Sequence, residues 1–312
     1  MGKGRLAILG AGESGVGAAI LGKEKGYEVF VSDFGQITEK YKNVLLQHEI
    51  EWEEGGHTQA RLLTAGLCVK SPGIPDTAPV VVAIKEAGIP VISEIEFGSW
   101  FTSARLIAIT GSNGKTTTAM LTYHLLKEGG LDVGLAGNIG DSFALKVIRE
   151  PRDYYVLEIS SFQLDGIRDF HPHISMITNI TPDHLDRYGY QMELYIRSKL
   201  RVFENQTEAD HFIYDLDDPV LAREIDPDTM RPQAWPQTLE KSLEKGGMLN
   251  ENQIEIRTNN TVLKMNTDSL ALEGQHNVKN TMAAATVAQL LGIRKETIRQ
   301  SVATFQGAPH RL

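Results

Sequence analysis

The chain has 312 residues and a formal net charge of −9 at pH 7. An acidic chain lacks the broad basic surface that nucleic acids require, so we expect no nucleic-acid partner. No apolar stretch reaches the roughly 18 residues of a membrane span, and the N-terminus lacks a signal-peptide pattern. We therefore expect a cytoplasmic protein without membrane partners. Because single hydrophobic cores stop growing at about 250–300 residues, the length predicts two domains.

The N-terminal segment reads as a strand, a glycine turn and a helix. An apolar strand at 6–9 runs into the sequence GAGESG at 10–15, and a helix is expected to follow to about Lys25. A second strand at 29–32 ends at Asp33. An acidic residue about 20 positions after such glycines is typical of a Rossmann-like βαβ unit that binds a dinucleotide. Because the same turn serves any phosphate-bearing ligand, and because glycines also permit tight packing, the ligand stays open at this point.

Alternating strands and helices continue to about Ser93. The loop Ser71-Pro72-Gly73 directly follows an apolar strand, and loops in that position bind ligands in open α/β sheets, although a plain turn explains them equally well. We expect residues 1–93 to form a Rossmann-like domain. Its remaining elements are predicted as strands at 50–52, 67–69 and 91–93 and helices at 38–48 and 79–87.

The sequence RLIAITGSNGKTTT at 105–118 predicts a second strand, turn and helix. Glycines let backbone N–H groups approach phosphate oxygens, and the N-terminus of the helix adds positive potential. Lys115 would reach the outer phosphates and the Thr116 hydroxyl would bind Mg²⁺. The common P-loop has four residues between its glycines, whereas only Ser112 and Asn113 lie between Gly111 and Gly114. The alternative is a strand-to-helix turn that happens to contain Gly-Lys.

We expect residues 94–305 to form a central P-loop ATPase-type α/β domain and 306–312 to begin a linker. Residues 215–260 are polar and weakly patterned, so we expect loops and a surface hairpin there without functional residues. The other predicted elements are strands at 132–136, 154–159, 174–179 and 212–214 and helices at 119–128, 192–203, 274–291 and 295–303.

Three further residues are candidates for chemistry. Glu158 ends an apolar strand, where a carboxylate beside a phosphate loop can meet a nucleotide-bound Mg²⁺, although a solvated strand-end glutamate is the alternative. His184 follows another strand and is either a metal ligand or a structural histidine. The spacing of Lys199 predicts only a solvated charge on a helix. The remaining histidines considered are expected to have no function: His48, His57, His171 and His173.

Seven motifs in this order and spacing resemble the Mur ligases, and the resemblance runs from the first glycine turn to the last residue. The short loop between Gly111 and Gly114 is this family's form of the P-loop. The sequence SSFQL after Glu158 favours the family member that adds D-glutamate. The motifs are TGSNGKTTT, GNIG, EISSFQLD, TPDHLDRY, SKLR, GQHNVKN and GAPHR.

The resemblance implies the following site residues. Catalytic roles fall to Lys115, Glu158, His184 and Lys199, with Lys199 carbamylated so that it becomes an anionic oxygen ligand. Two Mg²⁺ sites would use Thr116, Glu158, His184 and Lys199. The residues implied to bind ATP are Gly111, Ser112, Asn113, Gly114, Lys115, Thr116, Thr117, Asn277, Asn280 and Arg311. The residues implied to bind the other substrates are Gly12, Ser14, Asp33, Ser71, Pro72, Gly73, Asn138 and Ser160.

The resemblance also implies a reaction and its partners. A monomer would use ATP to join D-glutamate to UDP-N-acetylmuramoyl-L-alanine through an acyl phosphate, in the synthesis of peptidoglycan precursors. The family carries a third domain after the GAPHR segment, so we expect this chain to bind the UDP precursor but not to ligate. The alternatives are a diaminopimelate- or lysine-adding relative, folylpolyglutamate synthetase, a non-catalytic nucleotide-binding module and an NAD-dependent oxidoreductase.

Overall fold

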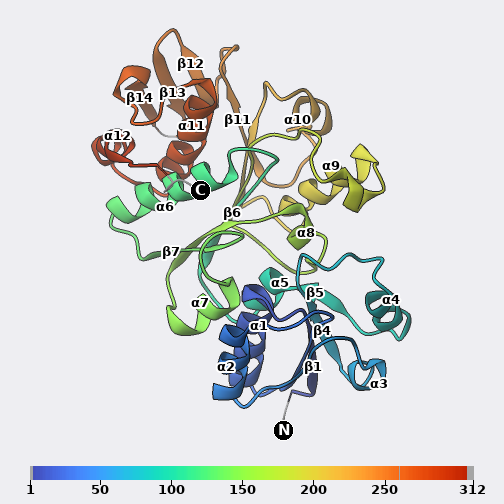
Figure 1. Cartoon of the computed structure of the whole chain (residues 1–312). Helices are drawn as coiled ribbons and strands as arrows, with labels where there is room; N and C mark the ends of the chain where they lie inside the picture. The colour runs from blue at the N-terminus through green and yellow to red at the C-terminus, as the bar shows by residue number, and fades with distance from the viewer. Residues whose placement is uncertain (1–2, 260, 308–312) are drawn as a thin grey trace. The chain divides into compact units, whose positions relative to one another are not determined.

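The computed structural model describes residues 3–259 and 261–307 and divides the chain into two compact units (Figure 1). The first unit takes in the chain up to Ser103 together with Ala136–Pro151 and Phe162–Phe170. The second unit comprises Ala104–Leu135, Arg152–Ser161 and the chain from His171 onward. The chain therefore passes between the units several times, and the domain boundary expected near Ser93 stays a prediction.

The first unit is built on a five-stranded parallel sheet with the order β3-β2-β1-β4-β5. The order reverses between β1 and β4, and ligands of open α/β sheets bind beside the strand ends at such a point. The strands are β1 (Arg5–Leu9), β2 (Glu28–Ser32), β3 (Glu51–Glu53), β4 (Leu67–Lys70) and β5 (Val91–Ser93). The helices are α1 (Glu13–Glu24), α2 (Glu39–Gln47), α3 (Gln59–Leu62), α4 (Pro79–Glu86), α5 (Glu94–Ser99) and α7 (Phe143–Arg149).

Alternate residues of β1 pack into two different cores. Leu6 and Ile8 belong to the core beneath α1 and α2, whereas Ala7 and Leu9 belong to the core beneath α3 and α4. Because successive side chains of a strand point to opposite faces, a fully apolar strand predicts a sheet covered on both sides. Cys68 is fully buried in the second of these cores, and burial raises the pKa of its thiol to about 12.

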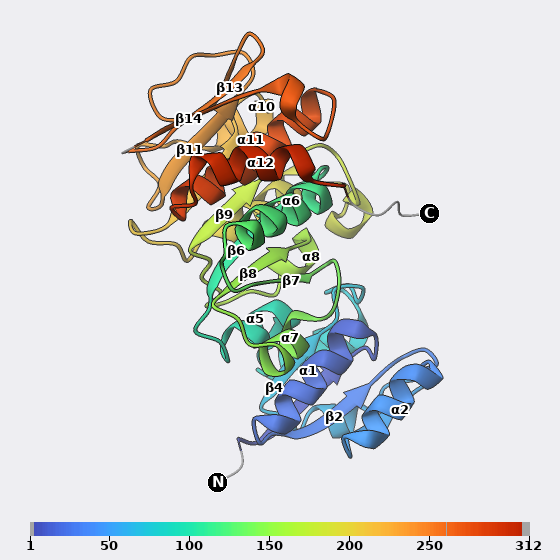
Figure 2. The same ribbon diagram turned by 90° about the vertical axis from the view of Figure 1, so that its left-hand side faces the viewer.

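The second unit contains a nine-stranded sheet with the order β14-β13-β12-β11-β10-β9-β6-β8-β7. Neighbouring strands pair in parallel from β8 to β12 and antiparallel from β12 to β14. Figure 2 shows α6, α11 and α12 together on one face of this sheet. The strands are β6 (Arg105–Thr110), β7 (Val133–Gly137), β8 (Tyr154–Glu158), β9 (Ile174–Ile177), β10 (His211–Asp215), β11 (Gln233–Thr238), β12 (Gly246–Asn250), β13 (Gln253–Arg257) and β14 (Val262–Asn266).

In the second part of the chain, α6, α9, α11 and α12 lie where helices were expected, whereas α8 and α10 were not predicted. The α-helices are α6 (Lys115–Glu128), α8 (Ser161–Leu164), α9 (Met192–Leu200), α10 (Pro219–Glu224), α11 (Gln275–Leu290) and α12 (Lys295–Thr304). Three short 3₁₀ segments complete the set: Leu185–Tyr188, Arg201–Phe203 and Thr267–Ser269. In the described part of the chain, no helix has the length and apolar character needed to cross a membrane.

The expectation of loops and a surface hairpin at residues 215–260 was only partly correct. A hairpin is present as β12 and β13, but it lies inside the sheet, where Met248, Ile254 and Ile256 are fully buried. β11 was missed altogether, although Trp235 in its middle is only 1% exposed. The expected α/β fold with a Rossmann-like sheet and a P-loop sheet is confirmed, and this region extends the second sheet instead of decorating its surface.

Candidate functional site

The loop between β6 and α6 accepts only glycine at two positions. Gly111 has φ +146° and Gly114 has φ +78°, both in the region that L side chains avoid. A Cβ added to Gly111 would lie 1.9 Å from the Thr178 hydroxyl oxygen, and one on Gly114 would lie 2.7 Å from the Asn280 side-chain oxygen. The loop is therefore pressed against two other segments of the second unit, and its backbone leads directly into the N-terminus of α6.

Two lysines converge on the carbonyl of Gly111. The Lys115 ammonium donates to the carbonyl oxygens of Gly111 and Ser112, at 2.9 Å in each case. The Lys199 ammonium donates to the same Gly111 oxygen at 2.8 Å and lies 4.6 Å from the centre of the Tyr195 ring. Lys199 is only 2% exposed, so it is not the solvated charge that its spacing predicted. Two positive groups at a phosphate-type loop favour a polyanionic ligand.

A hydroxyl and a carboxylate meet at the start of α6. The Thr116 hydroxyl donates to Glu158 Oε2 at 2.8 Å, and Glu158 is 1% exposed at the end of β8. Such hard oxygen donors are what Mg²⁺ prefers, and Mg²⁺ takes its remaining ligands from phosphate and water. Among the described residues no cluster of three or more His, Cys, Asp or Glu side chains could hold a metal. The pair Thr116 and Glu158 thus fits a cation that arrives with a nucleotide.

The segment after β9 is hydrogen-bonded to the phosphate-type loop. Ser112 Oγ donates to the Thr181 carbonyl at 2.8 Å, and the backbone N–H of Asn113 donates to Asn179 Oδ1 at 2.9 Å. His184 follows in the same segment with φ +48° and an exposed side chain, 3.6 Å from Asp183. The structure thus brings Lys115, Glu158 and Lys199 to one loop and places His184 on a segment tied to it.

The start of α11 approaches the same loop. Thr118 Oγ1 donates to Asn280 Oδ1 at 3.1 Å, and Asn280 Nδ2 donates to Asn277 Oδ1 at 3.2 Å. These contacts place both asparagines beside the first turn of α6. Half-buried Thr117 lies in that turn, whereas Arg311 falls outside the described residues.

An ion-pair group beside Asn280 was not foreseen from the sequence. The Lys279 ammonium donates to both carboxylate oxygens of Asp215, at 2.8 and 2.9 Å, and lies 3.1 Å from Asp217. Burial lowers the pKa of Lys279, but the hydrogen bonds and charges of the two aspartates outweigh it, so that pKa is raised. The sequence feature that could have pointed to this ion-pair group is the position of Asp215 at the end of an expected strand.

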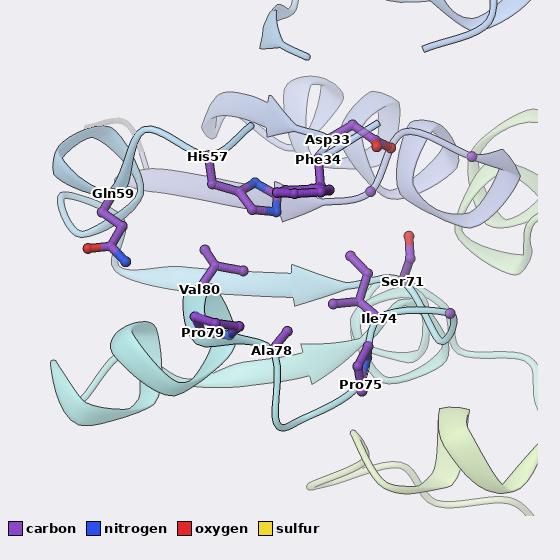
Figure 3. A pocket seen from close by; sticks show the side chains of 13 residues that line it. Asp33, Phe34, His57, Gln59, Ser71, Ile74, Pro75, Ala78, Pro79 and Val80 are labelled. Carbon is purple, nitrogen blue, oxygen red and sulfur yellow. The ribbon is translucent and has the colours of Figure 1, made fainter. Parts of the chain in front are cut away.

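The first unit contains a separate cavity of about 670 Å³ beside the ends of its strands (Figure 3). Its lining is mainly apolar apart from a few polar groups. The lining residues are Gly10, Gly12, Asp33, Phe34, His57, Gln59, Ser71, Gly73, Ile74, Pro75, Ala78, Pro79 and Val80.

Close backbone approach explains the glycines at the edge of this cavity. A Cβ on Gly15 would lie 1.9 Å from the Gly10 carbonyl oxygen, and a Cβ on Gly10 would lie 2.6 Å from Ser71 Oγ. Ser71 Oγ is buried without a hydrogen-bond partner among the described residues, which suits it to a ligand. The Asp33 carboxylate accepts a hydrogen bond from the backbone N–H of Ala11 at 2.7 Å and thereby stabilises the glycine turn.

Four more predicted site residues are placed as follows. Gly12 is the N-cap of α1, and Ser14 lies half-buried in its first turn. Pro72 lies half-buried between Ser71 and Gly73, in the loop after β4. Asn138 is exposed after β7 in a segment of the first unit.

Ser160 follows β8 and belongs to the second unit. Asn138 and Ser160 therefore belong to different units, and their joint role stays a prediction.

The segment that carries Asn138 is held by a buried carboxylate. Glu94 Oε1 accepts from Ser142 Oγ and from the backbone N–H of Ala144, at 2.6 Å in each case, at the start of α7. Glu94 is 1% exposed, and burial raises the pKa of its carboxyl to about 7 despite these hydrogen bonds. Nothing in the sequence pattern singled out Glu94, because its partners lie about 50 positions further along the chain.

The family model for the Mur ligase middle domain matches residues 109–288, and the model for the MurD N-terminal domain matches residues 5–80. The chain belongs to the Mur ligase family. Its β6–α6 loop and its glycine-rich cavity fall within the middle-domain and N-terminal matches respectively. ATP, Mg²⁺ and small-molecule substrates are consistent with membership of this family.

Relatives within the family are similar over the whole chain. A curated UDP-N-acetylmuramoylalanine–D-glutamate ligase from Christiangramia forsetii is 56% identical over 312 residues, which cover all of this chain and 70% of that protein. The ligase of the same name from Bacteroides fragilis is 50% identical, over 99% of this chain and 69% of its own length. These matches make the D-glutamate-adding branch, MurD, the nearest part of the Mur ligase family.

Solved Mur ligase structures share the fold. The UDP-N-acetylmuramate:L-alanyl-gamma-D-glutamyl-meso-diaminopimelate ligase from Neisseria meningitides superposes with a TM-score of 0.66 at 20% identity, covering 99% of this chain and 100% of that chain. The MurC ligase of Thermotoga maritima gives a TM-score of 0.58 at 20% identity, over 97% of this chain and 69% of that one. At these identities the comparison supports the architecture alone.

Proposed function

We propose that this chain is the catalytic part of an ATP-dependent ligase that joins D-glutamate to UDP-N-acetylmuramoyl-L-alanine in peptidoglycan precursor synthesis. The names of the relatives at 50–56% identity support the substrates. The observation that carries the proposal is the meeting of Lys115, Lys199 and Glu158 at one glycine loop. A protein that only bound nucleotide would not need a buried lysine and a buried carboxylate there.

The reaction needs charge neutralisation more than covalent help from the protein. The alanine carboxylate attacks the γ-phosphorus of ATP, ADP leaves, and the D-glutamate amine then displaces phosphate from the acyl phosphate. Carboxylate and triphosphate repel each other, so positive groups positioned at the transferred phosphate lower the barrier. We assign that role to Lys115 and to the backbone N–H groups of Gly111–Gly114, together with Ser112, Asn113 and Thr117 at the nucleotide.

Bound Mg²⁺ would neutralise phosphate charge at this loop. We assign Thr116 and Glu158 as protein ligands of one Mg²⁺ ion, and His184 and a carbamylated Lys199 as ligands of a second. Lys199 in its ammonium form binds the Gly111 carbonyl. Addition of CO₂ would convert it into an anionic oxygen donor, which suits a neighbouring cation better than an ammonium does.

The remaining assignments follow the same family. We assign Asn277, Asn280 and Arg311 to the nucleotide, and Asn138 with Ser160 to the acceptor side of the reaction. We further propose domains at 1–93 and 94–305, a cytoplasmic location and a monomer. The UDP part of the precursor is assigned to the cavity of the first unit. Its proposed contacts are Gly12, Ser14, Asp33, Ser71, Pro72 and Gly73.

A chimera tests the activity directly. The Christiangramia forsetii ligase with its matched 70% replaced by this chain should release ADP only when both UDP-N-acetylmuramoyl-L-alanine and D-glutamate are present. The unaltered relative is the positive control. The same assay on this chain alone shows how far activity depends on the part of the relative that this chain does not match. Turnover with diaminopimelate or lysine in place of D-glutamate would assign the chain to another branch. Failure with every amino acid, while the control works, would refute the proposed activity.

A further inference from the structure

Two aromatic rings stand side by side on one wall of the cavity in the first unit (Figure 3). The Phe34 and His57 ring centres are 5.9 Å apart, with their planes inclined at 43°. Phe34 is 76% exposed, although large aromatic side chains gain free energy from burial. Ile74 and Val80 line the other side of the cavity. A flat, partly polar ring would be enclosed between an aromatic and an aliphatic wall.

The hydrogen bonds behind His57 fix which of its nitrogens carries the proton. Ser32 Oγ, in a fully buried residue, donates to Glu53 Oε1 at 2.6 Å. The backbone N–H of Thr58 donates to the same oxygen at 2.8 Å, and the pKa of Glu53 is lowered despite its burial, so Glu53 is an ionised acceptor. Ser32 has one hydroxyl proton, and Glu53 takes it. His57 Nδ1, 2.7 Å from Ser32 Oγ, must therefore be the donor in that contact.

The other nitrogen of His57 is then an acceptor. Burial lowers the pKa of His57, and this outweighs the raising effect of the Glu53 and Asp33 charges, so the imidazole is neutral at pH 7. A neutral imidazole with its proton on Nδ1 carries a lone pair on Nε2. His57 lines the cavity, and its described contacts are those to Ser32 and Phe34, neither of which uses Nε2.

We propose that Phe34 and His57 select the base of the precursor, with Phe34 stacking on it and His57 Nε2 accepting a hydrogen bond from N3–H of uracil. This inference rests on the proposed function, which supplies the UDP group. Cytosine presents an unprotonated N3, which would place two lone pairs against each other. A buried acceptor left without a donor discriminates strongly, whereas stacking tolerates any base. His57 thus provides specificity and Phe34 provides affinity.

Calorimetric titration of this chain with UDP and CDP separates the two roles. The unsubstituted chain should bind UDP at least about tenfold more tightly than CDP, the value of one hydrogen bond and one unpaired group. His57→Leu should weaken UDP binding about tenfold and bring the UDP/CDP ratio close to one. Phe34→Ala should weaken both ligands by a similar factor of about ten and leave their ratio unchanged.

His48→Leu is the matched control, because His48 lies at the end of α2 and does not line the cavity. Circular dichroism of each variant separates loss of binding from loss of folding. A His57→Leu chain that retains the original UDP/CDP ratio would overturn the inference while leaving the proposed function intact. Failure of the unsubstituted chain to bind either nucleotide would overturn both.

The tautomer gives a second test that needs no ligand. Long-range ¹H–¹⁵N correlation spectra at pH 7.5 should show Nδ1 of His57 protonated and Nε2 unprotonated, with Ser32→Ala removing the preference. Protonation on Nε2 in the unsubstituted chain would turn the proposed acceptor into a donor, and the base-selection inference would be wrong.

Discussion

The two glycine turns of this chain, Gly10–Gly15 and Gly111–Gly114, are packed in the same way but have different neighbouring side chains. In both, a backbone atom or a side chain from another segment occupies the space that a Cβ would need. The first turn borders a large and mainly apolar cavity, whereas two lysine ammonium groups converge at the second. We propose that each turn binds phosphate and that the neighbouring side chains decide which phosphate-bearing molecule binds there.

The buried carboxylates of the two units differ in the same way. Glu94 is surrounded by uncharged donors, and burial raises its pKa to about 7. Glu158 accepts from Thr116 beside the loop where Lys115 and Lys199 meet. Glu94 holds the start of α7 in place, whereas we propose that Glu158 binds a cation. The four predictions below test this contrast.

The largest expected effect concerns the turn at Gly111–Gly114, where Lys115 and Lys199 meet. Glu158→Gln in the chimeric ligase should reduce ADP release about 10²–10³-fold. The proposed Mg²⁺ would lose a carboxylate ligand, and the negative charge of the transition state would lose the cation that neutralises it. UDP binding, measured by calorimetry, should not change. Glu128→Gln at the end of α6 is the control for a lost glutamate charge. Normal turnover of Glu158→Gln would remove the metal-binding role.

Lys199→Ala tests whether a carbamate is needed. Ligation by the chimera should fall about a hundredfold and recover in part when a short carboxylic acid such as formate is added, because the acid supplies the missing oxygen ligand. Lys127→Ala, in an exposed position of α6, should show neither loss nor recovery. Loss without recovery would leave Lys199 a structural cation at Gly111.

Glu94 predicts a pH dependence of stability in the first unit. Its folded-state pKa of about 7 lies above the usual 4.5, so the stabilisation is present below pH 4.5 and is lost as pH rises through 7. Between pH 5 and pH 8 the stability of the original chain should fall relative to Glu94→Gln by about 2.5 kcal/mol. Urea unfolding at both pH values measures the difference, with exposed Glu86→Gln as control. Parallel curves for the original chain and Glu94→Gln would contradict the prediction.

The smallest expected effect separates the two turns. Gly15→Ala places a Cβ against the Gly10 carbonyl oxygen, so we expect UDP affinity to fall about tenfold while ATP affinity stays unchanged. Gly66→Ala is the control, since its Cβ would meet nothing closer than 4.0 Å and its φ is not positive. Equal losses of both nucleotides would mean that the two turns do not act independently.

The sequence was sufficient where the pattern is local. The strand, glycine turn and helix at 105–118 lie where they were predicted, since the apolar run and the glycines are adjacent along the chain. The roles at Gly10 and Gly15 also follow from spacing, because α1 must pass close to the end of β1. The resemblance, and not the spacing, identified Lys199, which is buried through contacts with a loop 88 positions away.

The rest depends on contacts between distant segments. β11 was missed because Trp235-Pro236 and its polar neighbours show no clear alternation, and the strand forms between β10 and β12 instead. His57 was set aside as an ordinary histidine, since its tautomer depends on Ser32, 25 positions earlier. Such partners are found only after the chain has folded.

The discontinuous make-up of the first unit has a consequence for synthesis on the ribosome. Glu96 is fully buried and accepts backbone N–H groups of Arg168 and Phe170, at 2.8 Å in each case. A nascent chain that stops before Arg168 lacks these backbone donors and keeps only the Trp100 indole N–H, which donates to Glu96 Oε1, so burial of the carboxylate is costly. The N-terminal sheet therefore cannot reach its final stability before the later segments are synthesised. Translation must continue past β8 before the first unit can fold completely. Ribosome-bound chains halted at residue 103 should be cut by protease more readily than those halted beyond residue 170.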